Sequence, residues 1–275
     1  MPRALSRPAY NRGMTHRDAP DDHAIEERWT RAGTCDIFAR VTSIPPARPH
    51  PAVVLVHGLA VSSRLFLPTM AQLAPVFRTY APDLPGNGRS PKADIPSTIA
   101  GMADVLVDWL DALGLDRPVL AGHSAGAQVI AEVDHRHPGR IGAAVLVAPT
   151  GDPRSHNMLI QVSRLTRDAL REPTRLSLLV VQDYLRVGPR RNLAMIRSMN
   201  AHPMIDRVAK LTVPAVLVSG DRDAIVPARW LTTIARRLPG SRITLILAGA
   251  HGIQYTHGDA LAKAIRAFVE EQVGS

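Results

Sequence analysis

The sequence predicts an α/β fold in which a mostly parallel sheet carries helices on both faces. Two observations lead to this fold class. The chain has 275 residues, 45% of them hydrophobic, so it is long enough to bury a sizeable core. Short apolar runs also alternate with segments whose apolar residues recur at helical spacing. Such alternation is typical of a parallel sheet covered by helices.

The expected buried strands are short apolar runs that end in polar or turn-forming residues. They comprise residues 53–56, 118–121, 143–148, 213–219 and 243–247. A helix is expected after the second run, because Val129, Ile130 and Val133 recur at helical spacing and Gly139 follows the last turn. Cys35, the single cysteine, is expected in a strand and excludes an internal disulfide.

Ser124 is a candidate nucleophile. It lies in Gly122-His123-Ser124-Ala125-Gly126, between the run 118–121 and the predicted helix. A sharp strand-to-helix turn holds its apex residue in a strained conformation and needs small residues two positions away on either side. The serine hydroxyl then lies beside the helix N-terminus, where free N–H groups stabilise negative charge. Taken alone, the motif also fits a structural glycine-rich turn.

A serine nucleophile needs a histidine to take its proton and a carboxylate to orient that histidine. Asp221 and Asp223 follow the strand 213–219, and His251 follows the strand 243–247. Loops at the carboxyl ends of parallel strands are where such sheets build their sites. The order along the chain is therefore Ser, Asp, His.

These landmarks resemble the α/β-hydrolase family over residues of about 30 to 273. They come in the family's order: His57-Gly58 after the first buried strand, Asp83-Leu84-Pro85-Gly86-Asn87-Gly88-Arg89-Ser90, the Gly-x-Ser-x-Gly motif, Gly220-Asp221-Arg222-Asp223, and the late His251. The resemblance implies an eight-stranded, mostly parallel sheet with a helical cap. It also implies a serine hydrolase that needs no metal or organic cofactor.

Residue by residue, the resemblance implies Ser124 as nucleophile, His251 as general base and acid, and Asp223 as the residue that orients His251. Asp221 is the alternative carboxylate, with a turn role as its simpler interpretation. His257 is the alternative histidine, but it stands at the start of the last predicted helix, where a helix-entry role is favoured.

The resemblance also implies an oxyanion hole built from two backbone N–H groups. One belongs to Ala125 and the other to Leu59, with Ala60 as the alternative second donor. His57 and His123 flank the site and are expected to shape loops rather than transfer protons.

A long segment separates the strands 143–148 and 213–219, too long for an ordinary connection. Helical patterns over 159–170, 175–185 and 191–199 are separated by Pro173, Gly188-Pro189 and Pro203. We expect a small helical cap over residues 152–209, called the cap segment below. The hydrolase core then comprises 26–151 and 210–275, after a polar N-terminal extension of residues 1–25.

The cap segment is basic and rich in apolar side chains. From Arg154 to Lys210 the chain holds eleven Lys or Arg residues and four acidic ones, while the whole chain has a net charge of +9. This surplus would steer an anionic substrate or partner, or simply form a solvated face. The inner face is expected to set substrate choice and to come from apolar residues: Met158, Leu159, Val162, Leu165, Leu176, Leu179, Val180, Leu185, Met195, Ile196 and Met199.

Several other functions are disfavoured. No apolar run is long enough for a signal peptide or a membrane span, so a cytoplasmic location is expected. The basic residues are not interleaved with aromatic ones, which argues against single-stranded nucleic acid as a partner. His135 and His137 lie two residues apart on a predicted helix and point to different faces, so a metal site is not expected there. Gly86-Asn87-Gly88 lacks the third glycine of a dinucleotide-binding motif.

The predicted function is hydrolysis of a small or medium apolar carboxylic ester by Ser124, through an acyl-enzyme. Two alternatives would use the same residues: hydrolysis of a carbon–carbon bond in ring-cleavage products, and lactone hydrolysis. A third alternative is a receptor-like small-molecule binding protein, because fold alone does not fix function.

Overall fold

The computed structural model describes residues 25–42, 50–155, 158–238 and 240–273. Within these residues, eight strands form one sheet in the order β1-β2-β4-β3-β5-β6-β7-β8. The strands are β1 (Ile25–Ala32), β2 (Cys35–Thr42), β3 (Val53–Val56), β4 (Thr79–Pro82), β5 (Val119–His123), β6 (Ala143–Val147), β7 (Ala215–Gly220) and β8 (Arg242–Ile246). The cysteine therefore begins a strand, as expected.

The sheet is parallel from β4 to β8 in this order, while β2 pairs antiparallel with both β1 and β4. Strands β3, β5 and β6 are buried along their whole length, which explains why they read as continuous apolar runs rather than as alternating ones. The predicted eight-stranded, mostly parallel sheet is confirmed. β7 begins two residues later than predicted, beyond Pro214, which has no N–H to donate to a ladder.

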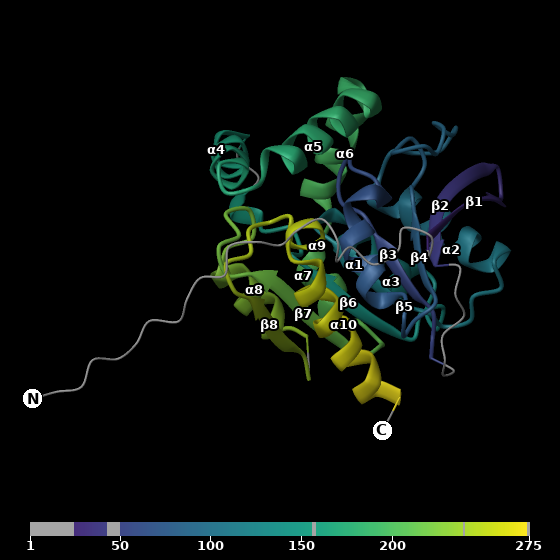
Figure 1. Ribbon diagram of the computed structural model, residues 1–275. Helices are drawn as coiled ribbons and strands as arrows, with labels where there is room; N and C mark the ends of the chain where they lie inside the picture. Colours follow the sequence, from purple (N-terminus) through teal and green to yellow (C-terminus); the bar gives the residue numbers. More distant parts are fainter. Residues whose placement is uncertain (1–24, 43–49, 156–157, 239, 274–275) are drawn as a thin grey trace, which may run out of the picture.

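Helices cover both faces of the sheet (Figure 1). Helices α2, α3 and α8 pack on one face, and α1 and α10 pack on the other. The helices and helical turns outside the cap segment are η2 (Ser63–Phe66), α1 (Leu67–Leu73), α2 (Ile99–Ala112), α3 (Ala125–Arg136), α8 (Ala228–Ala235), α9 (Ile253–Thr256) and α10 (Gly258–Val273).

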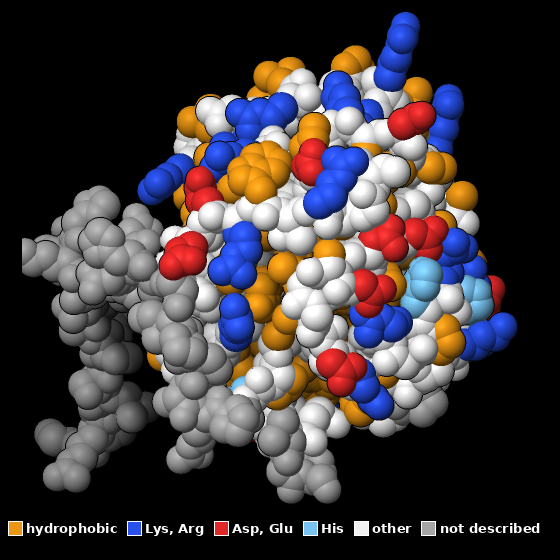
Figure 2. Space-filling view, turned by 90° about the vertical axis from the view of Figure 1, so that its right-hand side faces the viewer, with side chains coloured by type: hydrophobic (Ala, Val, Ile, Leu, Met, Phe, Trp, Pro, Cys, Tyr) orange, Lys and Arg blue, Asp and Glu red, His pale blue; other side chains and the backbone are white. Residues whose placement is uncertain are grey.

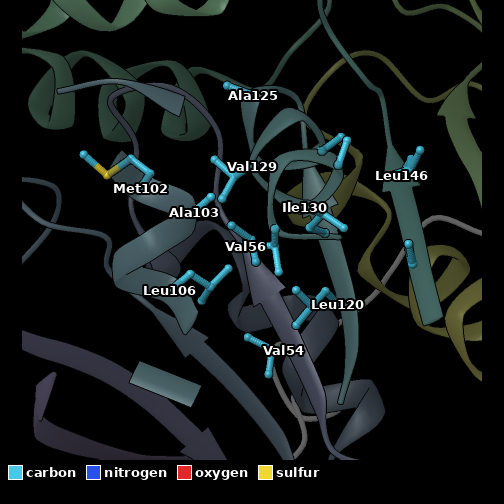
Figure 3. Packing of buried hydrophobic residues seen from close by; sticks show 14 of the residues in the cluster. Val54, Val56, Met102, Ala103, Leu106, Leu120, Ala125, Val129, Ile130 and Leu146 are labelled. Carbon is cyan, nitrogen blue, oxygen red and sulfur yellow. The ribbon is translucent and has the colours of Figure 1, made fainter. Parts of the chain in front are cut away.

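The core lies where α2 and α3 pack on the central strands (Figure 3). Val54 and Leu120 from the sheet meet Leu106 of α2 and Ile130 of α3, and all four side chains are fully buried. Each such side chain stabilises the fold by about 1.5 to 3 kcal/mol through removal of apolar surface from water. This packing fixes β3 and β5, so the loops at their carboxyl ends start from rigid positions.

The cap segment is helical and lies beyond the carboxyl ends of the parallel strands (Figure 1). Three helices agree with the predicted patterns to within a few residues, and one more follows Pro203. They are α4 (Met158–Ala169), α5 (Thr174–Val187), α6 (Pro189–Ala201) and α7 (Met204–Ala209), after the short turn η3 (Pro153–Ser155).

The apolar residues expected on the inner face of the cap segment differ in burial, and Leu179, Val180, Ile196 and Met199 are half-buried. Leu176 and Met195 are buried, as expected for an inner face. The expectation was wrong for Val162, Leu165 and Leu185, whose exposed fractions are 53%, 50% and 76%. An apolar position on a helix is buried only if that side of the helix meets the core, and these positions do not. The side chains of Met158 and Leu159, like residues 1–24 of the predicted extension, lie outside the described residues.

Candidate active site

Ser124 stands at the sharp turn between β5 and α3. Its backbone has φ 57° and ψ −118°, a conformation that non-glycine residues rarely adopt, and its side chain is only 8% exposed. A Cβ on Gly122 would lie 2.4 Å from the Gly126 carbonyl oxygen, and a Cβ on Gly126 would lie 2.3 Å from that of Val56. Both glycines are therefore required by close backbone contact, which is the physical basis of the motif.

The loop after β3 passes directly against Ser124. A Cβ on Gly58 would lie 3.1 Å from the Ser124 Cβ, so the backbone of this loop borders the hydroxyl. Leu59 follows immediately and is partly buried, and Ala60 has a positive φ of 55°. Ala125 begins α3 on the other side of Ser124. The two predicted oxyanion donors thus belong to the two segments that flank the serine.

Asp223 and His251 form a hydrogen-bonded pair. His251 Nδ1 lies 2.8 Å from Asp223 Oδ2, and the Asp223 side chain is fully buried. The other carboxylate oxygen, Oδ1, accepts the backbone N–H groups of Ile225 and Val226 at 2.7 and 2.8 Å. Asp221, the alternative carboxylate, is exposed. The structure therefore brings His251 together with Asp223 rather than with Asp221.

The ends of β7 and β8 approach closely, which brings this pair together. A Cβ on Gly220 would lie 2.1 Å from the Gly249 carbonyl oxygen, and the Arg222 N–H donates to that oxygen at 2.9 Å. The glycine that ends β7 is thus needed for the loop carrying Asp223 to meet the loop carrying His251.

His123, the residue before Ser124, contacts His251. Its ring centroid lies 4.6 Å from that of His251, and its Nε2 lies 2.9 Å from the His251 carbonyl oxygen. Because that partner is an acceptor, Nε2 carries the proton. Burial, helped by the charges of His251 and His57, holds the pKa of His123 well below its usual range, so this ring stays neutral. Among the described residues, no hydrogen bond joins the Ser124 hydroxyl to the His251 ring; such bonds often form only when substrate is bound.

His57 fastens the loop after β3 to the loop after β4. Its Nε2 accepts the Leu84 N–H at 2.9 Å, while Nδ1 donates to the Gly58 carbonyl at 2.8 Å. Asp83 is fully buried and accepts the N–H groups of Ser63 and Arg89 at 2.7 and 2.8 Å. The side chains of His57 and Asp83 thus bind backbone groups of the loops that border Ser124.

The remaining candidates lie away from this pair. His257 precedes α10 and contacts the Thr256 hydroxyl at 2.9 Å. His137 contacts Asp104 at 2.8 Å. In the part of the chain that the structure describes, no group of three or more His, Cys, Asp or Glu side chains could hold a metal ion. No helix formed by these residues combines the length and the apolar character needed to cross a membrane.

Two carboxylates that were not predicted as site residues bind the loop of His251. Asp168, near the end of α4, accepts the His251 N–H at 3.1 Å, and Glu172 accepts the Gly252 N–H at 2.6 Å. Burial lowers the pKa of His251, but the charge and hydrogen bond of Asp223 and the charges of Asp168 and Glu172 outweigh it and raise this pKa above its ordinary value of 6.5. The signal in the sequence that could have pointed to Asp168 and Glu172 is that they are acidic residues four positions apart in a basic segment.

Residues 53–264 match the alpha/beta hydrolase family. Because this match covers most of the chain and agrees with the fold, the chain belongs to that family and is a hydrolase. A relative named "Putative carbamate hydrolase RutD", from Caulobacter sp. (strain K31), is 28% identical over 265 residues and matches 87% of this chain and 98% of its own length. A pimeloyl-(acyl-carrier protein) methyl ester esterase from Neisseria meningitidis serogroup B is 28% identical over 246 residues, matching 79% of this chain and 92% of its own.

The fold also resembles solved structures. A thermophilic esterase from Thermogutta terrifontis superposes with a TM-score of 0.76 at 22% identity, covering 90% of this chain and 99% of the esterase. At this level of identity the likeness concerns the fold.

Proposed function

We propose that the protein is a serine hydrolase that cleaves small to medium apolar carboxylic esters through an acyl-enzyme. The observation that carries this proposal is the 2.8 Å contact between His251 Nδ1 and Asp223 Oδ2, together with a serine held in a strained turn whose neighbour His123 contacts the His251 carbonyl. The relative named as a methyl ester esterase supports an ester as the substrate class.

In the proposed reaction, Ser124 Oγ attacks the ester carbonyl carbon and its proton passes to His251 Nε2. Asp223 keeps the other ring nitrogen protonated through its hydrogen bond, which leaves Nε2 as the basic atom. The backbone N–H groups of Leu59 and Ala125 stabilise the oxyanion. His251 then gives its proton to the leaving alcohol. Water, deprotonated by His251, attacks the acyl-enzyme to release the acid and regenerate Ser124.

The first test is hydrolysis of p-nitrophenyl esters from acetate to laurate. We expect Ser124→Ala and His251→Gln to reduce turnover to near background, and Asp223→Asn to lower kcat by about 10⁴-fold, as expected when the histidine tautomer is lost. Asp221→Asn and His257→Gln are the matched controls. Asp221 is exposed, and His257 lies just before α10. Both should keep kcat within a few-fold.

Labelling by a fluorophosphonate probe tests the receptor-like alternative. An activated serine should be labelled in the native protein and not in Ser124→Ala. Ester turnover that survives in Ser124→Ala would contradict the proposed nucleophile. Labelling at Ser124 without turnover of any ester would instead favour lactone or carbon–carbon bond hydrolysis by the same residues.

A further inference from the structure

The end of α4 and the turn that follows it hold the loop that carries His251. Asp168 Oδ1 accepts the N–H groups of His251 at 3.1 Å and Ala224 at 3.4 Å. Glu172 Oε1 accepts the Gly252 N–H at 2.6 Å. In the same segment, the Arg171 guanidinium donates to the Arg222 carbonyl at 2.6 Å. This one turn therefore contacts both the Asp223 loop and the His251 loop.

The close packing of this turn depends on Gly252. A Cβ there would lie 2.5 Å from Leu176 Cδ2 and 3.0 Å from Glu172 Oε1. Leu176 in turn packs on Val61 and Leu65, which belong to the segment after β3. The contact between the cap segment and the His251 loop is therefore continuous packing and not two isolated hydrogen bonds.

The two carboxylates are unusual because no cationic side chain neutralises them. Asp168 is 6% exposed, and among the described residues neither Asp168 nor Glu172 forms an ion pair with Lys or Arg. This is so although residues 154–210 include eleven basic residues. Burial of an unpaired carboxylate is costly, and burial raises the pKa of both groups. Such a cost is expected to be offset where the charges have a use.

We propose that Asp168 and Glu172 are positioning residues for His251, which fix its backbone from the cap segment and stabilise its ring when it carries a positive charge. The proposal rests on the proposed function, because it assumes that His251 accepts the Ser124 proton. As that proton moves, the ring becomes an imidazolium that is hydrogen-bonded to Asp223, while the carboxylates of Asp168 and Glu172 bind the backbone of the same loop. The neutral His123 ring is the other titratable group against the imidazolium.

Two kinds of variant distinguish the effect of the carboxylate charge from the effect of the hydrogen bonds that hold the His251 backbone. Asp168→Asn and Glu172→Gln keep an oxygen that can accept the loop N–H groups but remove the charge, whereas Asp168→Ala and Glu172→Ala remove both. His251 must be neutral to act as the base. In the wild type, the midpoint of the acid limb of the pH profile of kcat/KM should therefore lie above pH 6.5, the ordinary pKa of histidine. Each amide variant should move this limb to lower pH, since it removes a charge that favours the protonated ring.

The alanine variants should in addition lower kcat by about 10- to 100-fold, with a smaller change in KM, because small displacements of a catalytic group are costly. Asp183→Asn is the matched control. Asp183 is a buried carboxylate of the same segment that binds Ser62 at 2.7 Å and Arg64 at 2.9 Å, and it has no contact with His251. Asp183→Asn weakens the attachment of the cap segment at that point and should leave the acid limb of the kcat/KM profile at the wild-type pH.

The titration of His251 gives a readout that does not need turnover. In ¹⁵N-histidine-labelled Ser124→Ala protein, the His251 resonances, assigned by their loss in His251→Gln, should titrate at lower pH when Asp168→Asn or Glu172→Gln is added. An unmoved titration and acid limb in both amide variants would overturn the proposal. So would alanine variants that lose no more kcat than Asp183→Asn. Failure of the proposed function is separate, because it appears as turnover that survives Ser124→Ala.

Discussion

Gly126 is the residue at which the nucleophile turn is packed most tightly. A Cβ there would meet the carbonyl oxygens of Val56 and His57 at 2.3 and 2.8 Å, and these are backbone atoms of β3 and its loop that cannot turn aside. We expect Gly126→Ala to displace α3 from β3. The free energy of unfolding of this variant should fall by about 3 kcal/mol or more, in the range of severe overpacking. Ester turnover should fall as well. Thermal unfolding and p-nitrophenyl ester hydrolysis measure the two effects.

Gly139→Ala is the control for this substitution. Gly139 follows α3 with φ 82° and has nothing within 4 Å of an added Cβ, so only backbone strain of about 1 to 2 kcal/mol is expected. Its melting temperature should fall less than that of Gly126→Ala, and its turnover should be retained. Equal losses in the two variants would mean that the contact with β3 yields and that the glycine is not required by packing.

At the residue scale, the sequence predicts which residues have a chemical role better than it predicts which residues are in contact. The Gly-x-Ser-x-Gly spacing indicates Ser124 because the turn needs glycine on both sides. Asp221 and Asp223 remain alternatives until the loop is folded, since both follow the same strand and only Asp223 turns inward. The sequence marks Asp168 and Glu172 only as acidic residues in a basic segment, because their contacts in the site are backbone N–H groups about 80 positions away along the chain.

The elements of the cap segment are attached to the core through α7 as well as through α4. Glu132 of α3 is buried and accepts Arg207 Nε of α7 at 2.8 Å, with His202 Nε2 at 3.2 Å. Burial raises the pKa of Glu132, but the hydrogen bond and charge of Arg207 and the charge of His202 outweigh it, and the pKa falls below 4.5. This attachment therefore stabilises the fold above that pH.

We expect Arg207→Ala to reduce the free energy of unfolding by about 2 kcal/mol at pH 7, the range for hydrogen bonds to buried charges. The sign of the pH effect follows from the lowered pKa: stabilisation is present above the unfolded value and is lost as pH falls through the folded value. The difference between wild type and variant should therefore shrink below about pH 4.5. Urea unfolding at several pH values measures it.

The comparison for Arg207→Ala is an exposed ion pair of the same helix α3, in which Arg136 contacts Asp104 of α2. Their side chains are 41% and 40% exposed, so Arg136→Ala should cost less than about 1 kcal/mol. A loss in Arg207→Ala no greater than this, or one independent of pH, would contradict the attachment of α7 through Glu132.

Helical periodicity predicts α4, α5 and α6 because their apolar residues recur at the right spacing, and Pro203 correctly ends the third. Periodicity does not state which apolar side of a helix meets another element. Val162 and Leu165 on α4 are therefore assigned to an inner face by sequence and lie exposed in the structure. Short strands such as β4 are set by pairing with β2 and β3, which local sequence does not encode.

Over the whole molecule, positive charge is distributed unevenly. The face shown in Figure 2 carries basic side chains interspersed with acidic ones. Outside the cap segment, several basic residues form ion pairs, such as Arg89 with Glu27 and Arg136 with Asp104. From Arg154 to Lys210, by contrast, basic residues outnumber acidic ones by seven. Arg171 and Arg191 donate to core carbonyl oxygens at 2.6 Å, contacts that hold the segment but do not cancel its charge.

This surplus should favour anionic substrates at low ionic strength. We expect kcat/KM for an ester with a free carboxylate to fall several-fold as the salt concentration rises from 0.01 to 0.15 M, where the screening length shortens from about 30 to 8 Å. A neutral ester of equal size should change little. Reversal of two exposed charges, in Arg190→Glu/Arg197→Glu, should flatten the salt dependence, whereas the same change outside the segment, in Arg236→Glu/Arg237→Glu, should not. Equal flattening by both would assign the effect to net charge alone, and a flat wild-type profile would mean that the basic residues form a solvated face.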